Sequence, residues 1–568
     1  MNYYSSDKST QILLALLKAH NIRYVIASPG TTNIALVGSM QYDSFFKMYS
    51  APDERSAAYM ACGLAAESGE CVIITCTEAT ASRDYLPGLT EAYYRKLPVL
   101  AITGHHGEEK IGHLFSQTID RHSIPNDVAK LSINVSKSYD EKKEWENIIN
   151  INRAILELNH RGGGPVHINL LSAYEAGFDQ KELPHVRKIM RYMPFQELPA
   201  LSTGRIAIFI GSHFKFSTEE TNMIEQFCEQ HDAVVFCDNT SGYYGKYRVN
   251  FSLVAGQQNY ISENLSMDIL IHLGEVSGAT YVTGKLKPKS VWRVSPDGEL
   301  RDTFRKLTCV FEMDELSFFN AYNSKEGEIP TSYYNKCISE YEQIYSKIPD
   351  LPFSNIWMAK ELYNKIPNDN VLHFGIFHSL RSWNFFILDR SVESSCNVGG
   401  FGIDGPVSTI IGASIARPNK LHFLIVGDLA FFYDLNSLGN RHVKGNLRIL
   451  LVNNGRGIEF RKKDHPGFKF GEDADPFFAA AGHYGNMSTD LVKHYAEDLG
   501  FIYIRATNKE EFKANMDAFV STDDLSRPIL FETFTQADDE VNSSYVLRNL
   551  ISDPINLLKK GIKKIMKS

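Results

Sequence analysis

The sequence has no long apolar segment and no sign of a sorting signal. Its apolar runs fall far short of the roughly 20 residues that a helix needs to cross a bilayer. The first ten residues, MNYYSSDKST, lack the basic stretch followed by an apolar one that marks a secretory signal. Low-complexity stretches and short-period repeats are also missing, which excludes a fibrous or repeat-built protein. We therefore expect a cytoplasmic protein.

The sequence also contains few cysteines and has a small net charge. Eight cysteines occur among 568 residues, none in a CxxC pair, and the closest two, Cys71 and Cys76, lack zinc-site spacing. We expect small buried thiols in a reducing compartment. The net charge of −8, from 67 acidic and 59 basic residues, leaves no broad basic surface for nucleic acid.

What the sequence does contain is the composition of a soluble globular protein. Hydrophobic residues make up 43% of the chain, aromatic residues 12% and charged residues 22%, which excludes a disordered chain. At about 150 residues per domain, the chain has room for three or four domains, and each can bury a core without crosslinks.

Short apolar runs alternate with helical segments along most of the chain. IRYVIASPG, CVIITCT and PVLAITG read as strands in the first third, separated by helical stretches such as DERSAAYMACGLAAESG. RIAIFIGS, AVVFCDN and MDILIHLGE continue the pattern, and LHFLIVGD, LRILLVNN and PILFETF repeat it later. This alternation predicts an α/β fold with parallel strands and crossover helices. We expect three doubly wound parallel-sheet domains, at 1–185, 190–345 and 350–545.

The last stretch, 546–568, differs from the rest. It ends in INLLKKGIKKIMKS, where leucine, isoleucine and methionine recur on one helical face and lysines surround the other. This pattern suits a helix in weak contact with an anionic membrane surface. The alternative is a solvated tail that packs on its own protein.

Two polar motifs follow neighbouring strands of the third predicted domain. LHFLIV ends in Gly427 and Asp428, and LRILLV ends in Asn453 and Asn454. Because parallel strands deliver their carboxyl ends to one edge of a sheet, we expect these side chains to lie close together. Carboxylate and amide oxygens suit Mg²⁺, and a glycine leaves room for a diphosphate to approach the backbone. Ordinary turn chemistry is the alternative.

These motifs resemble a known family. GDLAFFYDLNSLGNRHVKGNLRILLVNN looks like the diphosphate- and metal-binding motif of the thiamine diphosphate enzymes, the acetolactate synthase and pyruvate decarboxylase superfamily. NVGGFGIDGPVSTIIGASIA is closest to the menaquinone-pathway synthases within that superfamily. The resemblance covers nearly the whole chain. It implies a fold of pyrimidine-binding, central and diphosphate-binding domains, with thiamine diphosphate and Mg²⁺ as cofactors.

The resemblance also implies the ligands at the diphosphate end of the cofactor. Asp428 and the side chain of Asn454 would hold Mg²⁺, with the carbonyl of Arg456 as a third protein ligand. Gly427, Leu429 and Ala430 would line the diphosphate. Glu459 and Phe460 follow the metal loop and should border the same cleft, with Glu459 among the cofactor contacts.

Glu54, in PDERSAAYMACGLA, is the main catalytic candidate. Read from the residues alone, it is an acid favoured by the dipole at a helix start. In the family, a glutamate here hydrogen-bonds N1′ of the aminopyrimidine, so that the 4′-nitrogen can remove the proton of thiazolium C2. A carboxylic acid is required because the group must share a proton.

Four further residues align with the family. Ile403, otherwise an ordinary core isoleucine, matches the apolar wedge that brings the two cofactor rings together. Thr77 and Thr80 match the loop beside the pyrimidine, although Glu78 and Ala79 depart from its small or glycine residues. Gln117 falls where the family places a glutamine facing the reacting centre.

The sequence departs from the menaquinone synthases at their substrate arginines. Thr32 and Val398 stand where those enzymes have arginine, His105 and His106 replace an arginine pair, and only Arg381 is retained. Neither Thr nor Val can replace a guanidinium that clamps a carboxylate, so the isochorismate reaction is not expected. His105 and His106 could instead relay protons, as in the pyruvate decarboxylase group. Two exposed loop histidines are the alternative.

The sequence therefore favours a carboligase that decarboxylates a small 2-oxo acid and transfers the acyl-anion unit to a carbonyl acceptor. Simple decarboxylation with release of an aldehyde is the second reading. A degenerate scaffold or regulatory subunit is the third, supported by the altered TEATAS loop. The resemblance implies a homodimer or homotetramer, because two chains share each cofactor. No flavin and no nucleic acid is expected.

Overall fold

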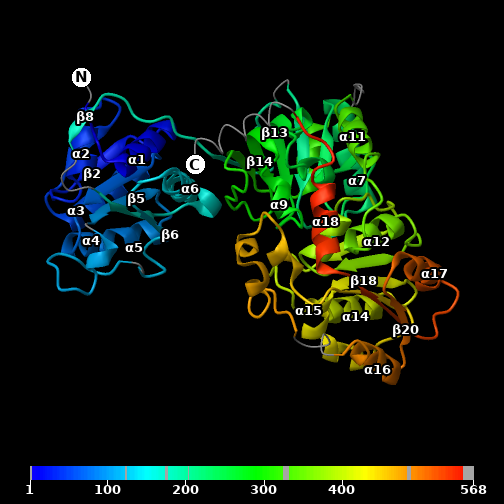
Figure 1. Cartoon of the computed structure of the whole chain (residues 1–568). Coiled ribbons are helices and arrows are strands. Elements are labelled where there is room, and N and C mark those ends of the chain that lie inside the picture. The colour runs from blue at the N-terminus through cyan, green and yellow to red at the C-terminus, as the bar shows by residue number, and fades with distance from the viewer. Residues whose placement is uncertain are drawn as a thin grey trace. The chain divides into compact units, whose positions relative to one another are not determined.

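The computed structural model describes residues 3–105, 107–121, 124–172, 177–201, 204–323, 332–482 and 488–553. The chain divides into two compact units (Figure 1). The first comprises Met1–Met193 and Gly298–Val310, and the second comprises Pro194–Asp297 and Phe311–Ser568. The polypeptide thus passes between the units three times.

The first unit is built on a six-stranded parallel sheet in the order β3-β2-β4-β5-β7-β6. Its strands are β2 (Tyr24–Ala27), β3 (Lys47–Ser50), β4 (Val72–Cys76), β5 (Val99–His105), β6 (Leu131–Val135) and β7 (Val166–Leu171). The helices are α1 (Lys8–Ala19), α2 (Ile34–Gln41), α3 (Glu54–Ser68), α4 (Thr80–Asp84), α5 (Leu86–Tyr94) and α6 (Glu141–Glu157). A short antiparallel pair, β1 (Tyr4–Ser5) and β8 (Phe178–Gln180), completes it.

Helix α3 shows how small residues shape this unit. Asp53 caps the helix by accepting the backbone N–H of Arg55, and Gly69 ends it at φ +68°. The buried face is made of small side chains, Ala57, Ala58, Ala61, Cys62 and Ala65. It lies so close to α5 that a Cβ on Gly88 would come within 2.4 Å of the Ala58 Cβ. This packing fixes the start of α3, where Glu54 stands.

Segment 298–310 belongs to the first unit through Asp302. The Asp302 carboxylate accepts hydrogen bonds from the Arg187 guanidinium and, at 2.9 Å, from Nε1 of Trp145. Its other oxygen accepts the backbone N–H groups of Lys306 and Leu307, each at 2.8 Å. The side chain is fully buried, so this carboxylate ties the returning segment to the body of the unit.

The second unit contains two parallel sheets. The central one runs β12-β11-β10-β13-β14, formed by β10 (Ile206–Ile210), β11 (Val234–Cys237), β12 (Arg248–Asn250), β13 (Ser266–Leu273) and β14 (Lys287–Val294). Its helices include α7 (Thr218–His231), α9 (Thr280–Thr283), α10 (Glu315–Tyr322) and α11 (Ser332–Tyr345).

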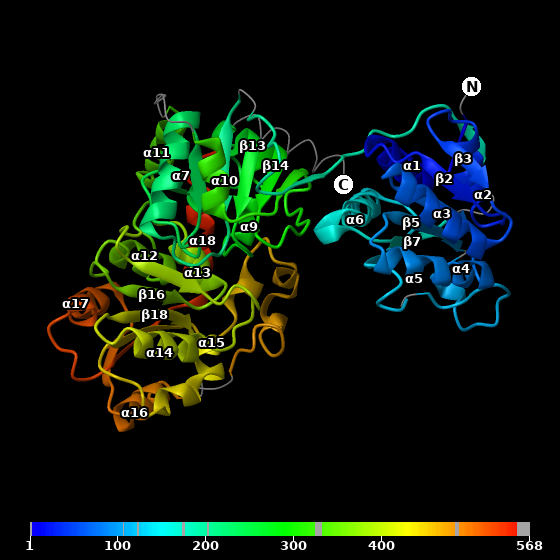
Figure 2. The ribbon, with the colours of Figure 1, turned by 180° about the vertical axis from the view of Figure 1, so that it is seen from behind.

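The C-terminal sheet has the order β17-β16-β18-β19-β21-β20. Its strands are β16 (Val371–Phe374), β17 (Glu393–Cys396), β18 (His422–Gly427), β19 (Leu447–Asn453), β20 (Ile502–Ala506) and β21 (Ile529–Phe534). The helices are α12 (Asn355–Leu362), α13 (His378–Trp383), α14 (Pro406–Ala416), α15 (Asp428–Tyr433), α16 (Leu491–Asp498), α17 (Lys509–Val520) and α18 (Ala537–Leu547). Helices α12 and α14 lie on opposite faces of this sheet (Figure 2).

Buried hydrogen bonds join the two halves of the second unit. Asn239, after β11, donates from its side chain to the carbonyl of Trp383 at 3.1 Å, and its backbone N–H donates to Asn384 at 3.1 Å. Gln257 donates to the carbonyl of Leu547 in α18 at 2.9 Å. Side chains of the central sheet can therefore line a pocket with those of the C-terminal sheet.

The predicted α/β fold is confirmed by these parallel sheets flanked by helices. All eight cysteines are free, and six of them are buried. Within the described ranges, no helix is both long and apolar enough to cross a membrane. The predicted domain boundaries stay predictions. Most of the basic tail, 554–568, lies outside the described residues.

Candidate active site

The candidate site lies at the carboxyl edge of the C-terminal sheet. The chain leaves β16 and β18 in opposite directions along the sheet, so these neighbours flank its topological switch point. Ligands of open α/β sheets bind at such points, beyond the carboxyl ends of the strands. Asp428 directly follows β18, and Asn454 directly follows β19. The sheet thus brings the predicted metal ligands to the same edge.

The Asp428 carboxylate is buried, and no cationic side chain pairs with it among the residues that the structure describes. The residue is 2% exposed and accepts backbone N–H groups from Leu429 at 2.9 Å and Gly455 at 2.7 Å. Burial raises the pKa of Asp428 to about 7, although these donors oppose the shift and nearby Glu532 adds to it. Because a carboxylate held this way is costly to ionise, a bound cation would fit it.

The other predicted ligands have the expected chemistry. The Asn454 side-chain oxygen lies 3.3 Å from the backbone N–H of Arg456, and the Arg456 side chain is paired with Asp475 at 2.6 Å. A Cβ on Gly427 would meet open space. Among the described residues, no group of three or more His, Cys, Asp or Glu side chains could hold a metal. The predicted ligands are one carboxylate, one amide oxygen and one backbone carbonyl, an all-oxygen set of the kind that Mg²⁺ prefers.

The remaining predicted cofactor contacts of this domain surround that point. Leu429 and Ala430 form the first turn of α15, with Ala430 buried. Ile403 precedes α14 and is half-buried, and it packs against the core cluster of β18 and β19. The cofactor roles that the resemblance implies for these residues stay predictions.

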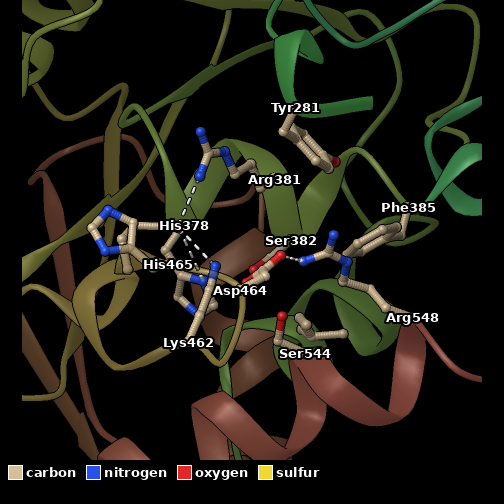
Figure 3. Close-up of a pocket in the computed structure, with 12 residues that line it drawn as sticks. Tyr281, His378, Arg381, Ser382, Phe385, Lys462, Asp464, His465, Ser544 and Arg548 are labelled. Atoms are coloured by element: carbon tan, nitrogen blue, oxygen red, sulfur yellow. Dashed lines mark hydrogen bonds and ion pairs between the residues drawn. The ribbon is translucent and has the colours of Figure 1, made fainter. Parts of the chain in front are cut away.

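Beside this edge lies a polar pocket of about 150 Å³ in the second unit (Figure 3). Tyr281 lines it from the central half, and Arg381 and Glu459 line it from the C-terminal half. The Arg381 guanidinium lies 5.1 Å from the centre of the Tyr281 ring. The retained arginine is thus held by an aromatic face from the other half of the unit.

Glu459 is the anionic centre of the pocket. Its carboxylate accepts Arg381 Nη1 at 2.7 Å and Lys462 Nζ at 2.7 Å. Burial alone would raise the pKa of Glu459, but the charges of Lys462, Arg381 and His378 lower it to about 2. Glu459 is therefore a permanent anion that holds two cations in place. The sequence analysis placed Glu459 at the cleft among the cofactor contacts, and that role stays a prediction.

A second buried carboxylate, Glu540, was not predicted. It is fully buried at the start of α18, and its oxygens accept the Thr535 hydroxyl at 2.7 Å and the Asn355 backbone N–H at 3.0 and 3.1 Å. Nε2 of His378 lies 2.7 Å from Oε2 of the same carboxylate. His378 also lines the pocket, with Nδ1 4.0 Å from Glu459. Nothing in the local sequence marks the pair, because its members lie far apart in the chain.

In the first unit, the predicted residues also gather at a carboxyl edge. Glu54 follows β3, Thr77 follows β4, and His105 is the last residue of β5. Glu54 is half-buried, whereas His105 is buried, at 6% exposure. His106 lies outside the described residues.

The loop after β4 is held by a threonine pair. The hydroxyls of Thr32 and Thr77 lie 2.8 Å apart, and a Cβ on Gly30 would come within 2.4 Å of the Thr77 Cβ. Glu78, where the family has a small residue, is buried at 3% exposure. Thr32, where the resemblance implies an arginine, thus forms a hydrogen bond with Thr77.

Two further predicted residues are exposed within the first unit. Thr80 begins α4, and its residue is exposed. Gln117 is exposed as well and adopts φ +60°, a left-handed backbone that is uncommon outside glycine. The predicted roles of Thr80 and Gln117 stay predictions.

Comparison with known proteins identifies relatives of this chain. Residues 7–124 match the family described as "Thiamine pyrophosphate enzyme, N-terminal TPP binding domain". A 2-succinyl-5-enolpyruvyl-6-hydroxy-3-cyclohexene-1-carboxylate synthase of Phocaeicola vulgatus is 31% identical, covering 94% of this chain and 97% of its own. The synthases of the same name from Bacteroides fragilis and Flavobacterium johnsoniae are 30% and 27% identical, covering 94% of this chain and 98% and 97% of their own.

Proposed function

The chain belongs to the thiamine diphosphate-dependent enzymes, and we propose that within this family it is a Mg²⁺-requiring carboligase. Its substrates would be a small 2-oxo acid, which loses CO₂, and a carbonyl compound, which accepts the remaining acyl unit. The observation that carries this proposal is the Asp428 carboxylate, buried at the switch point and hydrogen-bonded to backbone N–H groups. Such a group suits a cation that in turn holds a diphosphate.

The chemistry that thiamine diphosphate supplies when bound is the loss of CO₂ from a 2-oxo acid. The chain's residues would hold and orient it. Asp428, Asn454 and the carbonyl of Arg456 would bind Mg²⁺, while the open space at Gly427 admits a diphosphate. Glu54 would hold a proton at the pyrimidine end, and Ile403 would fix the angle between the rings.

The lost arginines support an acceptor less anionic than that of the relatives. Thr32 is 2% exposed and bonded to Thr77, and Val398 is 3% exposed. Neither position presents a cation to a carboxylate, so the two-carboxylate recognition that arginines provide is absent at these points. We therefore do not transfer the relatives' named reaction to this chain.

Simple decarboxylation is the second candidate, and His105 favours it. This histidine ends β5 at the same edge as Thr77, where it could return a proton in place of an acceptor. A chain that binds the cofactor without turnover is the third candidate. Its support is Glu78, buried where the family has a small residue.

Assembly is part of the proposal. Two chains would share each cofactor, one holding the pyrimidine through Glu54 and its partner holding the diphosphate through the metal site. The minimum active form would then be a homodimer, with a homotetramer as the larger option. Sedimentation of the purified protein with the cofactor present would measure this, and an active monomer would contradict it.

The test of the proposed function is a screen of 2-oxo acids for CO₂ release with thiamine diphosphate and Mg²⁺. Pyruvate and 2-oxoglutarate would be supplied with and without aldehydes. A hydroxyketone product supports the carboligase, whereas free aldehyde in the presence of an acceptor supports the decarboxylase. Cofactor binding without CO₂ release from any acid would leave the non-catalytic reading.

A further inference from the structure

A small cavity of the first unit is lined by none of the predicted site residues that the structure describes. Its walls come from helices α4 and α5, from strands β5 and β7 and from the chain that follows residue 120. Apolar side chains such as Leu89 and Val128 stand beside polar ones. The volume, about 20 Å³, holds one water-sized species. A monatomic ion therefore fits this space, whereas an oxyanion such as phosphate does not.

Arg121 brings a buried cation to this cavity. The residue is 4% exposed, and its Nη2 donates to the Gly104 carbonyl at 3.1 Å. Nε and Nη1 are buried as well, and neither has a hydrogen-bond partner among the described residues. A guanidinium stays protonated at any ordinary pH. Arg121 therefore has two buried nitrogens that need an acceptor.

The charge of Arg121 is not paired by the walls of the cavity. Among the described residues that line it, two are arginines and none is a carboxylate. Glu78 is the acid whose charge acts on Arg121, but it stands outside the lining and accepts nothing from Nε or Nη1. Burial lowers the pKa of Arg121, and the charge of Glu78 only opposes this shift. Because buried charges in proteins are normally paired, an anion in the cavity would supply the counter-charge.

His167, which also lines the cavity, adds neither a charge nor a free polar atom. Burial, with the charge of Arg121 as the next cause, lowers the pKa of His167 to about 3, so the ring is neutral. Its Nε2 lies 2.8 Å from the Thr103 hydroxyl, and its Nδ1 lies 2.8 Å from the Ser132 hydroxyl. The ring is thus fully engaged and does not provide the acceptor that Arg121 lacks.

Tyr85 provides a further donor on the same wall. The residue is fully buried, and its hydroxyl has no hydrogen-bond partner in the part of the chain that the structure describes. Burial raises the pKa of Tyr85 well above its ordinary value, so the hydroxyl keeps its proton and can donate it. The cavity therefore joins an uncharged O–H donor to the N–H donors of Arg121.

We propose that this cavity binds a chloride ion, which accepts N–H groups from Nε and Nη1 of Arg121 and the O–H group of Tyr85. The ion matches the size of the space and supplies the charge that the lining lacks. A water molecule would accept the same donors but would leave the charge of Arg121 unpaired. Chloride suits walls that are partly apolar better than fluoride does, because fluoride holds its hydration shell more strongly.

The ion would join two segments that carry predicted site residues. Arg121 lies four positions after Gln117, and Tyr85 directly follows α4, which begins at Thr80. One direct link between these segments is the hydrogen bond from Arg83 Nη2 to the Asp120 carbonyl, at 2.8 Å. A chloride between Arg121 and Tyr85 would add a second link, inside the unit, and would stabilise the fold of this edge.

The experiment is thermal unfolding of the full-length protein in sodium gluconate that is replaced stepwise by sodium chloride at constant ionic strength. We expect the melting temperature to rise by about 2–5 °C and to level off by about 100 mM chloride, because a specific site saturates. Bromide should replace chloride, and fluoride should not. Arg121→Met should abolish this rise. Arg95→Met, at the exposed Glu91 pair of α5, is the matched control and should keep it.

Diffraction from crystals soaked in bromide provides a measurement that depends on no variant. An anomalous peak between Arg121 and Tyr85 is expected. A melting temperature of the parent that ignores chloride, an equal rise in Arg121→Met, or bromide crystals without a peak in this cavity would each overturn the inference. None of these measurements involves CO₂ release, so this inference and the proposed function can fail independently.

Discussion

The Glu540 carboxylate lies 2.7 Å from Nε2 of His378, although 162 positions of sequence separate the two residues. The sheet makes this possible, because β16 leads into α13 and β21 leads towards α18 at one edge. Glu540 also anchors the first backbone N–H of α12, so the carboxylate joins three helices of the C-terminal half. The orientation of His378 is therefore set by the fold and not by its neighbours in the chain.

Replacing Glu54 by Gln should remove most of the activity. An amide cannot share the proton that the cofactor needs, so CO₂ release should fall about 10²–10⁴-fold while the protein stays folded. Glu67, exposed near the other end of α3, provides the control, and Glu67→Gln should turn over normally. A Glu54→Gln variant that matched the parent would refute the catalytic role.

Asp428→Asn should stabilise the protein when no divalent cation is present. The pKa of Asp428 is about 7 in the fold against an ordinary 3.8, so its ionisation costs stability as the pH rises from about 4 to 7. At pH 8 the variant should be more stable by about 1–4 kcal/mol, and at pH 4 the two should agree. Denaturant unfolding in the presence of a chelator measures this.

The same substitution should have the opposite effect when cofactors are added. Thiamine diphosphate with Mg²⁺ should raise the melting temperature of the parent, because a ligand that binds only the folded state stabilises it. The variant lacks the carboxylate, so its melting temperature should rise little when the cofactors are added. If the melting temperature of the variant rose as much as that of the parent, Asp428 would not hold the metal.

Glu459→Gln should destabilise the protein in a manner that depends on pH. The pKa of Glu459 is lowered from its ordinary 4.5 to about 2, so the ionised group stabilises the fold above about pH 4.5. The variant should be less stable by about 1–3 kcal/mol at pH 7, and the gap should narrow as the pH falls below 4.5.

A surface pair is the control for that measurement. Lys143 and Glu146 lie 2.8 Å apart on α6, where the Glu146 side chain is 48% exposed. Glu146→Gln should cost less than about 0.5 kcal/mol at any pH, because exposed pairs contribute little. If the difference in unfolding free energy between the parent and Glu459→Gln stayed the same from pH 7 to pH 3, the ionised Glu459 carboxylate would not be the source of that difference.

Ile403→Ala should impair turnover more than folding. The side chain is half-buried at the margin of the core, so truncation should cost about 1–2 kcal/mol. The loss of a wedge against the cofactor should lower kcat about 10–10²-fold. Ile415→Ala, at a position of α14 that is 51% exposed, is the matched control and should keep full activity.

The sheets could be predicted because their strands are buried on both faces. RIAIFIGS, LHFLIVGD and LRILLVNN contain β10, β18 and β19, and the structure buries nearly every residue of these strands. The same logic placed Asp428 and Asn454 at one edge, since parallel strands end together. The sequence motifs and the order of the strands place both residues at this edge, so the position of the site could be predicted from the sequence.

The pocket could not be predicted, because its groups meet only through tertiary packing. Glu540 sits in a run of acids, ADDE, that reads as an ordinary helix start, and His378 has no partner nearby. The Glu459–Lys462 pair was the one local signal, as residues three apart in a helical turn can meet. Its pairing with Arg381, 78 positions away, needed the fold.

The burial of Asp302 has a consequence for dissecting this molecule. A fragment ending at residue 193 would lack the carboxylate that accepts Trp145 and Arg187, leaving two donors unsatisfied at roughly 1–3 kcal/mol each. Truncating the chain at one position therefore does not yield the complete N-terminal unit. Expressing this unit alone would require a new loop that joins residues 298–310 to residue 193. Exchanging the unit between related proteins would likewise require both segments to be exchanged together.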